Sequence, residues 1–258
     1  MIRLVISNQR GGVSKTTTTT TLAHEFAARG KRVLVIDTDP QGSISSVLGL
    51  KPKYGLYNVV IEKLKFDDCI VKVSENLHVL CSSRETAKVE TILMGQVARE
   101  HAFAQVFSQV EKNYDVVLID VSPSITLLQT CAMVYAERVL IPIGMDTLSF
   151  QGAMASIEAS KSLNQLLKAN IRTVGLLPVM VDRRLAMTAT VLEGLDKLSA
   201  GMKIPLLPSI RTDQSVTKAA RAGQFLAVYD TKCKAAEDYI QVVNELEKLM
   251  QDDLNGVA

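Results

Sequence analysis

A glycine-rich segment near the start of the chain constrains the fold most strongly: residues 8–17 read NQRGGVSKTT. The segment follows the apolar run Leu4-Val5-Ile6 and precedes a helical pattern, so the chain opens as strand, turn and helix. Gly11 and Gly12 let the backbone curl with its N–H groups pointing inward, and the N-terminus of the next helix adds partial positive charge. This order of elements predicts a cradle for phosphate groups.

Two side chains behind the glycines suit the groups that such a cradle holds. We expect Lys15 to reach the β- and γ-phosphates of a nucleotide and the Thr16 hydroxyl to bind Mg²⁺. The loop departs from the common P-loop pattern, because Arg10 stands directly before the two glycines and Ser14 precedes the lysine. The expected nucleotide contacts of the loop are Arg10, Gly11, Gly12, Val13, Ser14, Lys15, Thr16 and Thr17.

The rest of the chain alternates strand-like apolar runs with helical patterns. This alternation predicts an α/β fold of the P-loop NTPase class, a doubly wound, mainly parallel sheet with helices on both faces. Strands are expected over residues 2–7, 32–37, 77–81, 116–120, 138–142, 173–178 and, as a short run, 206–208. Helices are expected over 15–29, 84–112, 124–136, 149–168, 186–200, 214–222 and 233–252.

Length and composition narrow the class of protein. A chain of 258 residues that is 47% hydrophobic suits one large domain, expected over residues 1–258. No apolar stretch approaches the roughly 20 residues that span a bilayer, and the first strand begins without a signal sequence, so we expect a cytoplasmic protein without stable membrane insertion. The four cysteines lack metal-site spacing and are expected to fill apolar space.

Three carboxylates follow apolar runs at positions where a nucleotide hydrolase needs them. Asp37 and Asp39 stand two residues apart at the end of the second expected strand, so both project from the same side, next to the phosphates. Asp120 ends the run of residues 116–120 and suits the metal side of the site. The alternatives are a turn cap before Pro40 for the first pair and a plain strand end for Asp120.

These motifs together resemble the deviant Walker ATPases of the ParA/MinD family over essentially the whole chain. The matching segments are RGGVSKTT at 10–17, DTDPQ at 37–41 and YDVVLIDVSPS at 114–124, with further matches at 140–142, 180–184, 219–223 and 229–230. The resemblance implies an ATP hydrolase that uses ATP and Mg²⁺. By position, it implies catalytic roles for Asp39, Lys15 and Arg10, metal contacts for Thr16, Asp37 and Asp120, and further nucleotide contacts for Met180 and Arg211.

Arg10 stands where the family carries a signature lysine that crosses the dimer interface to the partner's nucleotide. An arginine keeps the positive charge and the length of the side chain but changes the geometry of the hydrogen-bond donors. Some relatives that position protein cargo, such as the McdA ATPases, also lack this lysine. The chain therefore resembles both the short ParA/Soj-type partition ATPases and an McdA-like subgroup.

The resemblance also implies partners. ATP would close two subunits into a homodimer that binds DNA non-specifically, and a small cargo-bound adaptor, ParB-like or McdB-like, would stimulate hydrolysis; the expected location is the nucleoid. Residues 172–234 carry a net charge of about +5, which suits a polyanion, although a solvated helix surface is the plainer interpretation. Arg184 matches the position of a family DNA-binding arginine, and Arg211 lies near another such region. The further DNA candidates, by charge alone, are Lys218, Arg221, Lys232 and Lys234.

Three alternatives remain at this point. A MinD-like membrane-associated ATPase would dock through a terminal amphipathic helix, but the stripe in residues 233–252 favours packing, and the QDDL that begins at 251 is acidic. A metabolic ATPase on the same fold is the second alternative; an iron–sulfur type would need paired cysteines, and Cys131 lacks an evident companion. The third, suggested by Arg10, is a nucleotide-locked switch that does not hydrolyse ATP.

Overall fold

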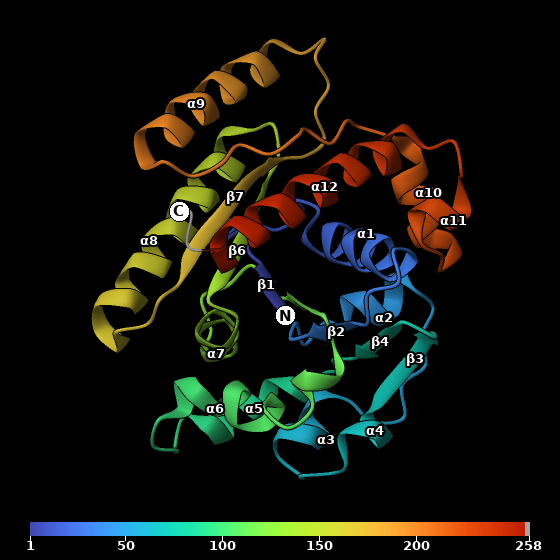
Figure 1. Cartoon of the computed structure of the whole chain (residues 1–258), viewed down its shortest axis with the longest axis vertical. Coiled ribbons are helices and arrows are strands. Elements are labelled where there is room, and N and C mark those ends of the chain that lie inside the picture. Colours follow the sequence, from blue (N-terminus) through green and yellow to red (C-terminus); the bar gives the residue numbers. More distant parts are fainter. Residues whose placement is uncertain (256–258) are drawn as a thin grey trace.

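A mainly parallel sheet forms the centre of the protein (Figure 1). The computed structural model describes the backbone of residues 1–255 and the side chains of residues 1–251. Within this part the sheet has seven strands in the order β3-β4-β2-β5-β1-β6-β7, and β3 runs antiparallel to β4 at one edge. The strands are β1 (Ile2–Ile6), β2 (Val33–Asp37), β3 (Ile70–Ser74), β4 (Leu77–Leu80), β5 (Val116–Asp120), β6 (Arg138–Ile143) and β7 (Arg172–Pro178).

Helices cover both faces of this sheet, as the continuous apolar strands predict. In β5, Val116 and Leu118 join the cluster that contains α1 and α12, whereas Val117 and Ile119 join the cluster with α3, α5, α6 and α7. A third cluster packs α8 and α9 against β6 and β7. The helices are α1 (Lys15–Ala28), α2 (Ser43–Val47), α3 (Leu56–Val60), α4 (Phe66–Cys69), α5 (Thr86–Leu93), η1 (Arg99–His101), α6 (Ala102–Phe107), η2 (Glu111–Asn113), α7 (Leu127–Ala136), α8 (Thr147–Leu167), α9 (Ala186–Met202), α10 (Gln214–Ala222), α11 (Leu226–Tyr229) and α12 (Lys234–Asn255).

The α/β class and six of the expected strands are confirmed, and two expectations are corrected. The run 206–208 forms no strand, although Leu206 makes an isolated parallel bridge to Leu176 of β7. The single helix expected over 84–112 is wrong, because the segment divides into α5, η1, α6 and η2. Helix α5 ends at Leu93, just before Gly95, and the left-handed conformation of Ala98 (φ 53°) separates it from η1. The edge strand β3 was not expected at all.

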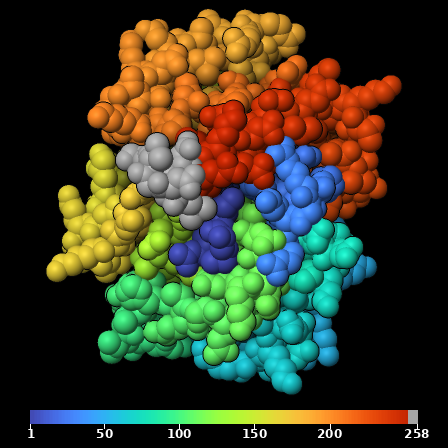
Figure 2. All heavy atoms as spheres, viewed as in Figure 1, coloured from blue at the N-terminus to red at the C-terminus, as the bar shows by residue number. Residues whose placement is uncertain are grey.

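One domain over residues 1–258 remains a prediction, and residues 256–258 lie outside the described part. No helix in the described part has the length and apolarity to cross a membrane. The space-filling view shows the C-terminal third, in orange and red, as a continuous surface above the N-terminal strand (Figure 2).

The apolar stripe of α12 packs onto the domain, as expected. Tyr239, Val242, Val243 and Leu246 are at most 1% exposed. The Tyr239 hydroxyl also forms a hydrogen bond of 2.9 Å with the Thr18 hydroxyl of α1. This buried bond fastens the last helix to the helix that follows the glycine loop. The sequence also predicts that the acidic segment beginning at 251 disfavours a membrane role, but its side chains from 252 onward lie outside the described part.

We predict that Tyr239→Phe lowers the free energy of unfolding by about 1–2 kcal/mol, because the Thr18 hydroxyl loses a buried partner while the ring remains packed. Urea unfolding measures the change. Tyr229→Phe is the matched control, since the Tyr229 side chain belongs to a residue that is 39% exposed. Equal stability of the two variants would show that the hydroxyl pair does not fasten α12 to α1.

Candidate nucleotide-binding site

The glycine loop curls through two residues in the left-handed region. Gly12 has φ 77° and Ser14 has φ 56°, a conformation that glycine adopts without strain and other residues rarely adopt. Helix α1 begins directly afterwards at Lys15, and the Ser14 side chain does not cap it. The first N–H groups of a helix have no partner within the helix. The loop therefore presents backbone donors and a helix N-terminus to the same space, as the sequence predicts.

Asn8 fixes the segment that connects β1 to the glycine loop. Its side-chain nitrogen donates to the carbonyl oxygens of Pro142 (2.8 Å) and Ser149 (3.2 Å), and its Oδ1 accepts from the Arg10 N–H (2.9 Å). Helix α8 approaches this segment through Gly152, where a Cβ would lie 3.0 Å from the Arg10 backbone nitrogen and would clash with the Asn8 side chain. The position of Arg10 at the start of the loop is thus set by β6 and α8.

Lys15 lies folded against its own loop. Its Nζ donates to the carbonyl oxygens of Asn8 (3.1 Å) and Arg10 (2.8 Å). Burial lowers the pKa of the Lys15 ammonium, and the nearby carboxylates of Asp120 and Asp39 act in the opposite direction. A phosphate group on the loop offers this ammonium a stronger, charged acceptor than two carbonyls do.

Thr16 and Asp120 bring two oxygen ligands together at the carboxyl edge of the sheet. The Thr16 hydroxyl donates to Asp120 Oδ2 (2.7 Å), and the Thr19 hydroxyl donates to Oδ1 (3.2 Å). Burial raises the pKa of Asp120 to about 6, against the lowering effect of these hydroxyls and of the Lys15 charge. Hydroxyl and carboxylate oxygens suit Mg²⁺. The described residues contain no group of three or more His, Cys, Asp or Glu that could hold a metal, so water and phosphate oxygens would have to complete its shell.

Asp37 and Asp39 take different positions, although both follow β2. Asp37 is fully buried, and its carboxylate accepts from the N–H groups of Asp39 (3.0 Å) and Ile44 (3.1 Å). Burial, together with the charge of Asp120, raises the pKa of Asp37. Asp39 lines the cavity described below, and its Oδ1 accepts from the Gln41 N–H (2.9 Å). Asp37 thus shapes the turn, whereas Asp39 faces the space where a ligand would bind.

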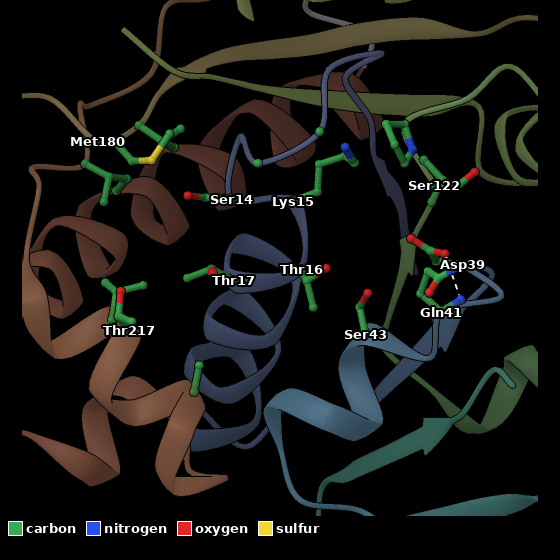
Figure 3. A pocket seen from close by; sticks show the side chains of 18 of the residues that line it. Ser14, Lys15, Thr16, Thr17, Asp39, Gln41, Ser43, Ser122, Met180 and Thr217 are labelled. Atoms are coloured by element: carbon green, nitrogen blue, oxygen red, sulfur yellow. Dashed lines mark hydrogen bonds between the residues drawn. The ribbon is translucent and has the colours of Figure 1, made fainter.

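A cavity of about 930 Å³ lies over the loop (Figure 3). Asp39 and Ser122 lie at one side of it, the loop and the start of α1 form its floor, and Met180 and Thr217 lie at the other side. The sequence-predicted residues in its lining are Gly11, Gly12, Ser14, Lys15, Thr16, Thr17, Asp39, Met180 and Arg211. Four of the predicted nucleotide and metal contacts are not among the lining residues: Val13, Asp37 and Asp120 are buried, and Arg10 is exposed. Asp120 reaches the cavity through its bond to Thr16.

Several lining residues were missed by sequence reasoning. They lie in the loop after β5 and at the start of α10: Val121, Ser122, Pro123, Ser124, Thr126, Thr212, Asp213, Val216 and Thr217. The first group directly follows Asp120, so the rule that ligands bind at the carboxyl edge of a parallel sheet could have found it. The second group carries no motif and comes to the cavity only through tertiary packing.

The basic candidates divide into paired and unpaired residues. Arg184 pairs with Asp182 and Arg211 with Asp238, each through two side-chain hydrogen bonds. Lys234 pairs with Glu237. Within the described residues, the exposed candidates that form no ion pair are Lys218, Arg221 and Lys232.

Comparisons with known proteins found a family model and relatives that each match more than half of this chain. Residues 1–173 match the AAA_31 family model, described as an AAA domain. The chromosome partitioning protein ParA of Caulobacter vibrioides is 30% identical over 252 residues, which covers 94% of this chain and 92% of that protein. The sporulation initiation inhibitor protein Soj of Bacillus subtilis is 28% identical over 247 residues, with 94% and 97% covered.

A solved structure is similar over nearly the whole fold. The cobyrinic acid a,c-diamide synthase from Mycobacterium smegmatis, with a bound ATP analogue and magnesium, superimposes with a TM-score of 0.82 at 26% identity. The match covers 96% of this chain and 95% of that one. The site of this chain fits both of these ligands. The unpaired N–H groups of the loop and the Lys15 ammonium suit the phosphates of the ATP analogue, and the oxygens of Thr16 and Asp120 suit magnesium.

We predict that Lys15→Ala abolishes measurable ATP binding, because the ammonium over the loop is the charge best placed to meet the phosphates. Titration calorimetry with ATP measures the effect. Lys72→Ala, which removes an exposed lysine from the edge strand β3, should bind ATP as the wild type does. Unchanged ATP affinity of Lys15→Ala would show that the loop is not the phosphate site.

Proposed function

Because this chain belongs to the AAA_31 family of AAA domains, we propose that it partitions or positions a cargo on DNA through a cycle of ATP binding, dimerisation and hydrolysis. The chain is a P-loop ATP hydrolase, and its cofactors are ATP and Mg²⁺. Bound Mg²⁺ would neutralise charge that develops on the transferred phosphate. The name of its relative in Caulobacter vibrioides, chromosome partitioning protein ParA, supports a role in partition.

The observation that carries the proposal is the placement of Arg10. This exposed residue does not line the cavity of its own chain, yet its backbone is held firmly at the start of the loop by Asn8 and Gly152. A cation in this position is available to the phosphates of a second copy. We therefore propose a homodimer with ATP between the subunits, in which Arg10 takes the place of the signature lysine.

The roles proposed inside each cavity follow from the contacts. Lys15 would bind the β- and γ-phosphates, and Thr16 with Asp120 would hold the metal ion. Asp39, which faces the cavity, would orient the water that attacks the γ-phosphate. Asp37 would support this arrangement through its bond to the Asp39 N–H, as part of the outer metal shell.

DNA would bind through exposed cations of the C-terminal third. Lys218 and Arg221 lie three residues apart on α10, so they share one side of this helix, and neither forms an ion pair in the described part of the chain. Lys232, Lys234 and Arg184 would add to this surface. Contacts to phosphates alone make binding independent of sequence and sensitive to salt. The proposed location is therefore the nucleoid, with a ParB-like or McdB-like adaptor linking the cargo.

The similarity to the diamide synthase favours a metabolic ATPase as a second candidate function. The two candidates differ in what stimulates hydrolysis: DNA and a protein adaptor in the first, and a small-molecule acid in the second. A MinD-like membrane role has less support, because the apolar stripe of α12 is buried in the domain. Stimulation of ATP turnover by DNA would decide between the two candidates.

We predict that Asp39→Ala binds ATP but hydrolyses it at least about a hundredfold more slowly, because the attacking water loses its orienting carboxylate. The variant should stay on DNA as a closed dimer after ATP addition. Phosphate release and light scattering measure the two effects, and ADP serves as the control that should not retain the protein. Turnover equal to the wild type would remove Asp39 from the mechanism.

We predict that the double variant Lys218→Glu and Arg221→Glu weakens retention on non-specific DNA by at least about tenfold and makes its salt dependence shallower, since two phosphate contacts are lost. The matched control is Lys63→Glu with Lys72→Glu, which changes the net charge equally at exposed positions elsewhere. Equal losses in the two double variants would mean that net charge alone, rather than α10, governs DNA binding.

A further inference from the structure

A bidentate ion pair joins the last long helix to the wall of the nucleotide cavity. The Arg211 side chain donates from Nε to Asp238 Oδ2 (2.8 Å) and from Nη2 to Oδ1 (2.7 Å), and the Arg211 backbone N–H also donates to Oδ2 (3.0 Å). The Asp238 side chain is 13% exposed and that of Arg211 is 52% exposed. Three bonds to one carboxylate hold both the backbone and the guanidinium plane of Arg211 in one orientation.

Arg211 lies at the end of the cavity that remains for the nucleoside. Thr16 and Asp39 mark the end where the metal ion and the last phosphate belong. From there the cavity passes over the loop to Met180 and Thr217 (Figure 3). Arg211 also lines the cavity, and its bridge to Val181, the residue after Met180, places it at this end. A nucleotide with its phosphates on the loop must therefore direct its sugar and base towards this second end.

Two further carboxylates lie close to Arg211, and each has a different partner. Glu237 pairs with Lys234. Asp213 accepts from the Ser215 N–H (2.9 Å) and from the Cys233 thiol (3.3 Å), so it caps α10 and binds the start of α12. Asp238 is thus the carboxylate that orients the guanidinium. The next residue of α12, Tyr239, bonds to α1, so two consecutive residues of one helix contact the helix at the floor of the cavity and the wall at Arg211.

We propose that Asp238 is a positioning residue, which holds Arg211 at the nucleoside end of the cavity and thereby lets α12 set the affinity for nucleotides. The inference rests on the proposed function only in its assignment of this cavity to ATP. It also separates the two arginines named as DNA candidates. Arg184 forms a similar bidentate ion pair, or fork, with Asp182, but its side chain is 90% exposed and lines no part of the cavity. In this proposal Arg211 binds the nucleotide and not DNA.

The test compares ligands with and without a nucleoside. Asp238→Asn should bind ATP and ADP about tenfold more weakly, because the Arg211 guanidinium loses the carboxylate that orients it towards the nucleoside. Inorganic tripolyphosphate, which reaches only the loop, should bind with unchanged affinity. Turnover at saturating ATP should stay within about twofold of the wild type, so that KM changes and kcat does not. All measurements are made without DNA.

Asp182→Asn is the matched control, since it breaks an equivalent fork outside the cavity and should leave ATP affinity unchanged. Arg211→Lys gives a second route if Asp238→Asn does not fold, because lysine keeps the charge without the fork and should show the same selective loss. An unchanged Kd for ATP in these variants, or an equal loss for tripolyphosphate, would overturn the proposal. Absence of ATP binding by the wild type would instead overturn the assignment of the cavity.

Discussion

The turn at Gly12 and Ser14 is the constraint on which the site depends. A chain that reverses through two left-handed residues and then enters a helix points its free N–H groups into one space. Such a turn is stable only if the residues next to it are held in place. Asn8 holds them through hydrogen bonds to β6, to α8 and to the loop itself. The requirement for glycine at 152 follows from the same close approach.

The parallel sheet brings the remaining chemistry to this turn. β2 and β5 are direct neighbours of one another, and β5 pairs with β1, so their last residues meet next to the loop: Asp37 pairs in register with Asp120, and Asp120 with Ile6. Burial at this edge raises the pKa of both carboxylates, and the hydroxyls of Thr16 and Thr19 partly compensate at Asp120. A divalent cation bound at this edge would offset this crowding of acidic groups. The stability of the edge and its function are therefore linked.

Short sequence motifs and the spacing of apolar residues predicted those parts of the fold and the site that depend on neighbouring residues in the chain. The glycine loop, the buried strands and the order of the carboxylates are visible in the sequence because each needs particular residue types at fixed spacing. The edge strand β3 was missed although Val71-Lys72-Val73-Ser74 alternates apolar and polar residues. The helix over 84–112 was overextended because a left-handed alanine leaves no compositional signal. The fork between Arg211 and Asp238 joins residues that are 27 positions apart, and only packing of α12 brings them together.

The most direct test of the account is retention of the purified wild-type protein on non-specific double-stranded DNA. The measurement is made with ATP and Mg²⁺, with ADP and without nucleotide, each at low and at raised salt. We predict retention with ATP and Mg²⁺ but not with ADP or without nucleotide, because the DNA surface is completed only when ATP joins two copies. Raised salt should abolish this retention. Retention that is equal in all three nucleotide states, or absent from all of them, would contradict the proposed function.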